Sequence, residues 1–454
     1  MKYLKRLILM FLLIQAVACS KDVLDKDPVS SFSAQDFYKT SADARAGVNG
    51  IYDALQSTFS RNFAFWGEGR ADAVDTRHSG DPLALKQNNL TPTINSASWN
   101  NLYEMISRAN YAIKYIPGVF EEENDYSRQL IGQARALRAL AYFYGVKIWG
   151  DVPLILEPYE SIKQDVFVNR TDEEAVLDQV INDLRYAAEN AQNADNGGES
   201  LFMTQEAAQA LLVHVYMWRE DYPAAIEAAE KVINSGIYSL EDISNWNKIF
   251  TTGSSNETIF EIGYNETQTN FLRVLYALGS DSHYFPSEKF RNSFEEGDAR
   301  QHLIYDETEE NPRKIWKFFG AGFNDEDPSP SENNIVLLRL ADIMLLKAEA
   351  HNALGETEKA LDLLNTIRER AELPGLTEQE AIEGYGDIES AILHERFIEL
   401  SFEGHRWFDL VRTGRAIEVM NPINGLSDEL NLVWPIHEDA LNRNPNLDQN
   451  LFYR

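Results

Sequence analysis

Apolar residues recur at helical spacing along much of this chain. From Ser41 they fall on one face at steps of three and four residues, at Ala44, Val48, Ile51 and Leu55. This pattern predicts an amphipathic helix. Comparable stripes and cap signals predict further helices over 102–116, 127–149 and 171–191. The helical pattern returns at 334 and continues to about 415, so the sequence predicts a mainly α fold.

Two of the helical stretches resemble each other. Residues 215–226 and 349–361 each predict a helix, a tight turn and a second helix that begins with small residues. The small side chains of Ala225 and Ala360 allow paired helices to pack closely, as in a tetratricopeptide (TPR) hairpin. The two stretches lie far apart in the sequence, so they do not form a clean tandem array, and generic helical hairpins stay open as the alternative.

The segment between these hairpins has poor periodicity. Residues 236–333 are rich in Gly, Ser, Asn, Pro and aromatic residues. Because so long a structureless segment is unusual in a compact domain, we expect a loop-rich insertion with a few short strands, one of them at 258–263. The final stretch, 431–454, also has the composition of a loop.

The N-terminus has the layout of a secretory signal. Lys2, Lys5 and Arg6 precede a short apolar run at 7–14, and small residues lead to Cys19, the only cysteine of the chain. A cysteine at the cut site looks like a bacterial lipobox, in which the thiol is acylated. We therefore expect a signal peptide at 1–18, a lipid on Cys19 and a polar tether at 19–30. An ordinary signal peptide with an incidental cysteine is the alternative.

Composition narrows the class of partner. The formal net charge is −31, and an acidic surface repels nucleic acid phosphates, so we expect no DNA or RNA binding. After Cys19 no apolar run approaches the length of a transmembrane helix. The aromatic content of 11% permits stacking on sugar rings, although most aromatic rings are expected in the core.

Charged and aromatic residues are densest at 394–412. Glu395, Glu399 and Glu403 follow one another at single-turn spacing. Paired carboxylates beside a histidine could serve acid–base catalysis. A zinc helix is excluded because Ile398 stands where the second histidine would have to be. We expect instead a semi-buried Glu–Arg network that joins two helices, with no catalytic residue, no metal and no cofactor.

This segment closely resembles the SusD/RagB family of outer-membrane lipoproteins. Other segments match motifs of that family in the same order, at 134–143, 149–154, 338–350, 434–436 and 444–450. The resemblance implies a single SusD-like domain at 31–454, with a helical TPR-like scaffold at about 31–235 and 334–454 and the variable region at 236–333. It also implies a surface-exposed, lipid-anchored outer-membrane protein. Such a protein binds an oligo- or polysaccharide and delivers it to a SusC-like TonB-dependent transporter, over which it sits like a lid.

In this family sugar contacts come mostly from variable loops, and two stretches look like those places. A sugar site needs an aromatic face and polar groups that pair with hydroxyls. The first stretch is 66–95 and the second is 284–323. For any one residue there, core packing or turn chemistry is the alternative. The candidate ligand-binding residues are Trp66, Arg70, Asp72, Asp75, Arg77, Asn95, Tyr284, Trp316 and Phe319.

The acidic run 295–300 lies inside the second stretch. It lacks the alternating carboxylates of a twelve-residue calcium loop, so we expect a structural turn there. Three other functions stay open beside glycan capture. They are a peptide-binding lipoprotein with the same transporter role, a lipoprotein glycosidase with paired carboxylates, and an adaptor that binds only protein.

Overall fold

The computed structural model describes residues 34–161, 163–196, 199–307, 312–323 and 332–454. The expected signal peptide at 1–18, the lipidation site Cys19 and the tether at 19–30 lie outside the described residues. Helices dominate, and the prediction of a mainly α fold is confirmed. Within the described residues, no helix has both the length and the apolar character needed to cross a membrane.

Among the described residues, nine helices of twelve or more residues build the scaffold. They are α3 (Ser41–Gly67), α5 (Asn100–Tyr115), α6 (Asp125–Trp149), α7 (Glu173–Asn190), α8 (Gln205–Trp218), α9 (Tyr222–Ile233), α14 (Leu340–Ala353), α15 (Thr357–Arg370) and α17 (Ile388–Glu399). The shorter helices are α2 (Ala34–Phe37), α4 (Asp81–Lys86), α10 (Lys248–Thr251), α11 (Leu272–Tyr276), α12 (Glu288–Arg291), α13 (Gln301–Ile304), α16 (Glu378–Tyr385), α18 (Arg406–Arg412), α19 (Ala416–Asn424) and α20 (Glu438–Arg443).

Local signals explain where the long helices begin and end. The side chain of Thr40 accepts from Asp43 N–H, and Asp43 accepts in return from Thr40 N–H, which closes a capping box at the start of α3. Asp172 caps α7 by accepting from Glu174 N–H. Helix α6 ends at Gly150, whose φ of 70° suits glycine.

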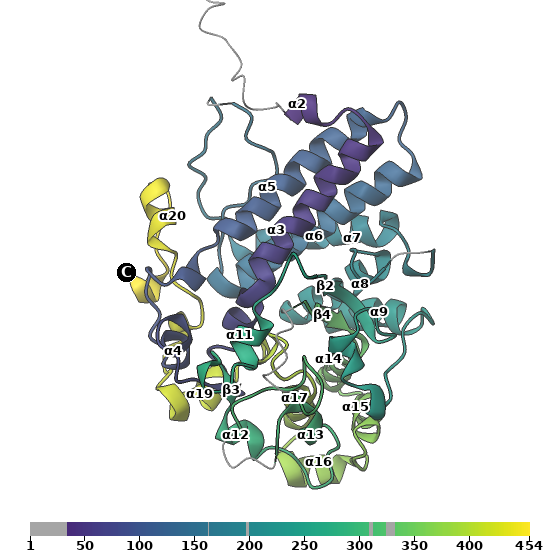
Figure 1. The fold of residues 1–454 in the computed structure, drawn as a ribbon, viewed down its shortest axis with the longest axis vertical. Coiled ribbons are helices and arrows are strands. Elements are labelled where there is room, and N and C mark those ends of the chain that lie inside the picture. Colours follow the sequence, from purple (N-terminus) through teal and green to yellow (C-terminus); the bar gives the residue numbers. More distant parts are fainter. Residues whose placement is uncertain (1–33, 162, 197–198, 308–311, 324–331) are drawn as a thin grey trace, which may run out of the picture.

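The scaffold is a series of packed helical hairpins. Each long helix from α3 to α9 contacts the next, and α9 then contacts α14, which packs on α15 and α17. Figure 1 shows α3, α5 and α6 as three long rods lying side by side in the upper half of the molecule. The predicted TPR-like pairs are α8–α9 and α14–α15. Ala225 and Ala360 are fully buried, as close helix packing requires.

The few strands form two small antiparallel sheets. In one sheet, β2 (Thr258–Ile262) pairs with β4 (Ile335–Arg339), and all ten residues are buried. The strand predicted at 258–263 is thereby confirmed. The expectation that a helix resumes at 334 is wrong, because 335–339 is a strand and α14 begins only at Leu340. A short apolar run that is buried on both faces does not distinguish strand from helix by periodicity.

The C-terminal segment closes the core although it contains only short helices. Trp434 is fully buried beside Trp149, whose indole N–H donates to the carbonyl of Pro435 at 3.1 Å. The Asn450 amide donates to the carbonyls of Trp149 and Trp434 at 3.1 and 2.7 Å. The segment predicted to be loop-like is thus irregular but held in place by core contacts, and it includes α20.

Candidate functional site

The sequence motif at 394–412 folds into a buried network of arginines and carboxylates. Glu395 and Glu399 on α17 both accept from the same nitrogen of Arg300, at 2.5 and 3.0 Å. Arg339, at the end of β4, donates to Glu399 at 2.6 Å and to both carboxylate oxygens of Glu403 at 2.8 Å. None of these five side chains is more than 3% exposed. The predicted Glu–Arg network is confirmed.

This network stabilises the fold, and its carboxylates are not free to act as a catalytic pair. Burial opposes ionisation of Glu399, but the charges of Arg370, Arg339 and Arg300 overcome it and hold the pKa of this carboxyl well below its usual range. A glycosidase needs two carboxyl groups that face an open cleft. Glu395 and Glu399 are covered and salt-bridged, so the structure contradicts a glycosidase that uses this pair.

The acidic run at 295–300 is a structural turn, as predicted. Glu295 receives two hydrogen bonds from Arg368, at 2.6 and 3.0 Å, and one from the hydroxyl of Tyr385 at 2.6 Å. The hydrogen bonds from Arg368 lower the pKa of Glu295 to about 2. Asp298 pairs with Arg300 at 2.7 Å. These carboxylates are matched by cations of the protein itself.

One group of potential metal ligands lies within the described residues, at His214, Asp342 and His405. Both carboxylate oxygens of Asp342 already have partners, since one pairs with His214 at 2.7 Å and the other with Arg396 at 2.8 Å. A guanidinium at this position supplies the positive charge that a metal would otherwise bring. We interpret the group as a structural link between α8, α14 and the motif at 394–412.

Two candidate residues of the first stretch belong to the core. Trp66 lies in the last turn of α3 and is fully buried, and its indole N–H donates to the carbonyl of Ser96 at 2.9 Å. Arg70 is also buried and lies over the ring of Trp407, with its guanidinium 4.1 Å from the ring centroid. Trp66 is buried because α3 continues to Gly67, and the burial of both side chains argues against contact with a ligand.

Asp72 and Tyr284 are buried as well. Asp72 receives two hydrogen bonds from Arg406, at 2.8 and 3.0 Å, and pairs with Lys289 at 2.8 Å. Tyr284 is fully buried and meets the ring of Phe65 edge-on. The burial of Tyr284 and the pairing of Asp72 with two cations argue against contact of either side chain with a sugar, although Asp72 borders the larger hollow described below. Asp72 instead joins the motif at 394–412 to the surface described next.

The two candidate stretches meet in the second small sheet. Strand β1 (Val74–Asp75) pairs with β3 (Phe285–Pro286), so that Asp75 stands opposite Phe285. The hydroxyl of Thr76 donates to the carbonyl of His283 at 2.6 Å and extends the pairing. Segments far apart in the chain therefore form one surface. Figure 1 shows β3 in the lower part of the molecule, near α4, α12 and α19.

Two hollows flank this sheet and together form what we call the β1–β3 cleft. The larger, of about 560 Å³, is bordered by α4, α12 and α19 and includes Lys86, Gln87, Lys289 and Asn424. The smaller, of about 230 Å³, is lined by Asp75, Thr76, Arg77, Phe285, Pro286, Glu288, Arg291, Pro312 and Arg313. Both hollows are bordered by Asp75 and Thr76.

Of the predicted site residues, Asp72 and Asp75 line the larger hollow, and Asp75 and Arg77 line the smaller one. Asn95 is exposed beside α4 but does not line either hollow. Trp316 and Phe319 are half-buried, and the Phe319 ring lies 4.7 Å from that of Phe323. They also stand outside the two hollows, and their role in binding stays a prediction.

Sequence reasoning missed the basic residues of the cleft. Arg291 and Arg313 belong to the second candidate stretch, where only aromatic residues were selected. Arg313 lies over the ring of Phe285, with its guanidinium 4.1 Å from the ring centroid. The available signal was the presence of Arg291 and Arg313, the latter directly after Pro312, in a segment of an acidic chain that lacks helical periodicity.

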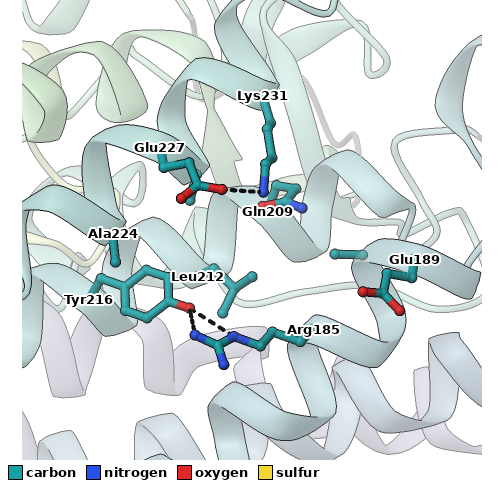
Figure 2. A pocket seen from close by; sticks show the side chains of 10 residues that line it. Arg185, Glu189, Gln209, Leu212, Tyr216, Ala224, Glu227 and Lys231 are labelled. Atoms are coloured by element: carbon teal, nitrogen blue, oxygen red, sulfur yellow. Dashed lines mark hydrogen bonds and ion pairs between the residues drawn. The ribbon is translucent and has the colours of Figure 1, made fainter.

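A third hollow, of about 320 Å³, lies among α7, α8 and α9. Figure 2 shows that its polar side chains are largely paired with one another. Arg185 donates to the Tyr216 hydroxyl at 3.1 and 3.2 Å, and Lys231 pairs with Glu227 at 2.9 Å. Because these groups already satisfy each other, this hollow is a weaker candidate for ligand binding than the β1–β3 cleft.

Glu68 lies in the first candidate stretch, and its burial predicts that stability depends on pH. It is fully buried, and burial raises the pKa of its carboxyl to about 8. The folded state therefore holds a proton that the unfolded state releases above about pH 4.5. Stability is lost as pH rises through this window, by up to about 1.4 kcal/mol per pH unit. We expect Glu68→Gln to flatten the fall in melting temperature between pH 5 and pH 8.5.

A matched control for this experiment is Glu266→Gln, which alters an exposed carboxylate. It should leave the pH profile of the melting temperature unchanged. An identical pH profile for Glu68→Gln and the unmodified protein would contradict the assignment of the proton to Glu68.

The scaffold of helical hairpins thus holds its paired carboxylates in the interior and has a polar cleft on its surface. Comparisons with known proteins identify the family of this chain. Residues 22–217 match the family model described as "Starch-binding associating with outer membrane", and residues 255–453 match the SusD family model. A SusD-like protein, P38 of Formosa agariphila, is 33% identical, with all of both chains covered. The chain belongs to the SusD family, whose members are binding proteins.

Solved structures agree with this assignment. A SusD superfamily protein from Bacteroides vulgatus has a TM-score of 0.80 at 24% identity, over 92% of this chain and 100% of that one, which shows the shared fold. A laminarin-binding SusD-like protein has a TM-score of 0.77 at 25% identity, with 92% of this chain and all of the other covered. The family is associated with the outer membrane.

Proposed function

We propose that this protein binds an oligo- or polysaccharide at the cell surface and delivers it to a SusC-like TonB-dependent transporter. A lipid on Cys19 would hold the chain at the outer membrane. Membership of a starch-binding family and the likeness to a laminarin-binding protein support this proposal. Membrane fractionation of a Cys19→Ser variant tests the anchor, since loss of the lipid should release the protein.

The observation that carries the proposal is the β1–β3 cleft. Asp75 offers an acceptor for sugar hydroxyls, Arg77 offers several donors, and the stacked pair of Phe285 and Arg313 borders the same hollow. Sugar recognition combines an apolar ring face with polar groups that replace the water lost by the hydroxyls. The cleft brings both kinds of group together on one surface.

Calorimetric binding to a panel of oligosaccharides and peptides tests the function. The protein used is residues 20–454, which carries no lipid and keeps every described residue. We expect saturable binding to one class of glycan, and we expect Phe285→Ala to weaken it about tenfold, because stacking on an aromatic ring contributes about 1–1.5 kcal/mol. Phe120→Ala is a matched control, since this half-buried ring lies outside the cleft.

Other outcomes would contradict glycan capture. Binding to peptides alone would favour the peptide-cargo alternative, in which the same scaffold passes peptides to the transporter. Binding to the transporter without any small ligand would favour an adaptor. Circular dichroism and melting temperature establish that each variant is folded before its affinity is compared.

A further inference from the structure

The β1–β3 cleft has a charge opposite to that of the protein as a whole. The chain carries a formal charge of −31. Yet its smaller hollow is lined by three arginines, Arg77, Arg291 and Arg313, and by only two carboxylates among the lining residues, Asp75 and Glu288. The adjoining hollow adds Lys86 and Lys289, together with Asp72, which pairs with Lys289 at 2.8 Å. A basic surface of this kind attracts anions over a distance, in contrast to the acidic remainder.

Two of these arginines are available to a ligand. Arg77 is exposed, and Arg313 is partly exposed with its guanidinium flat against Phe285. Within the part of the chain that the structure describes, neither Arg77 nor Arg313 pairs with a carboxylate. The network arginines differ in this respect, because Arg300 and Arg339 each contact several carboxylates.

Arg313 lies close to other cations of the smaller hollow. Partial burial, followed by the charges of Arg77 and Arg291, lowers the pKa of Arg313. Part of this repulsion is offset by Asp75. An anion placed between the guanidinium groups would relieve the remainder. Its oxygens would match the planar, forked donors of arginine, which favour bidentate contacts with oxyanions.

We infer that Arg77 and Arg313 bind an anionic substituent of the glycan, a sulfate ester or a carboxylate. The stacked ring of Phe285 borders the same hollow, and the larger hollow, with Gln87 and Asn424, adjoins it for the neutral part of the sugar chain. This inference rests on the proposed function and specifies its ligand as a polyanionic oligosaccharide.

The experiment compares matched glycans on residues 20–454. The probes are neutral β-glucan oligosaccharides, sulfated galactan oligosaccharides with their desulfated forms, and oligogalacturonate with its carboxyl-reduced form. We expect binding to an anionic probe, loss of that binding when the anionic group is removed, and weakening as salt rises, because exposed charge pairs are screened. The two anionic series distinguish sulfate from carboxylate.

Substitutions in the cleft test whether the anionic probe binds there. Arg77→Gln and Arg313→Gln are each expected to weaken binding of the anionic probe about tenfold or more, as expected for a hydrogen bond to a charged group. Arg77→Lys should lose less, since it keeps the charge but not the fork. Arg443→Gln, an exposed arginine on α20, is the matched control and should leave affinity unchanged.

The results that would contradict the anionic ligand, the cleft assignment and the proposed function can be distinguished. Tight binding to a neutral glycan that Arg77→Gln and Arg313→Gln leave unchanged would overturn the anionic ligand but keep glycan capture. Binding of an anionic probe that neither variant weakens would overturn the assignment to this cleft. No binding to any glycan would overturn the proposed function itself, and the inference with it.

Discussion

Replacing Arg339 with Gln is expected to destabilise the fold by about 3–5 kcal/mol, the usual cost of breaking a buried ion pair. Arg339 donates to Glu257, Glu399 and Glu403, at 2.6–2.8 Å, and its side chain is 1% exposed. Glutamine cannot reach all three groups. The variant therefore leaves carboxylates buried without the cation that allows them to stay ionised, which costs more than the loss of any one hydrogen bond.

Urea unfolding measures this effect, and Arg415→Gln is its matched control. Arg415 pairs with Glu389 at 2.8 Å, but both side chains are partly exposed. Exposed pairs contribute between about 0 and 1 kcal/mol because water and salt screen them. A loss below about 1 kcal/mol for Arg339→Gln would show that the buried network is not what holds the C-terminal motif against β4.

Replacing Gly67 with Ala is expected to destabilise the protein by about 3 kcal/mol, at the upper end of typical overpacking costs. A Cβ atom at Gly67 would overlap the backbone carbonyl of Gly404. Neither backbone can retreat easily, because Gly404 N–H also donates to buried Glu68 at 2.9 Å. The last turn of α3 and the motif at 394–412 would have to separate, and the β1–β3 cleft depends on both through Asp72 and Arg406.

Gly384→Ala is the matched control for this second substitution. Gly384 also lies in a helix, α16, but nothing stands within 4 Å of the position that a Cβ would take. Because alanine has the higher helix propensity, this variant should be stabilised by about 0.5–1 kcal/mol. Thermal unfolding of both variants gives the comparison. Equal melting temperatures would contradict a close contact at Gly67.

Much of the scaffold could be predicted from local sequence alone. The stripe from Ala44 to Leu55 and the cap at Asp172 identify α3 and α7, because helix formation depends on neighbours three or four residues away. The hairpins around Ala225 and Ala360 followed from the same short-range signals. The pairing of Glu395 and Glu399 with arginines could also be expected, since buried carboxylates require matched cations.

The candidate site could be predicted only in part. The sequence selected Asp75 and Arg77, which line the β1–β3 cleft, but it could not separate them from Trp66, Arg70 and Asp72, whose side chains are buried. Burial of Asp72 depends on Arg406, which lies 334 positions away. Local periodicity contains no information about such a partner.

The sequence by itself determined most of the long helices, that a charged network closes the C-terminal motif, and that residues 66–95 and 284–323 differ from the scaffold. Only the tertiary structure decided that 335–339 is a strand and that β1 pairs with β3. It alone decided which arginines are covered and which, like Arg77 and Arg313, reach the surface. The physical reason is that local spacing sets secondary structure, whereas burial and pairing are set by contacts between distant segments.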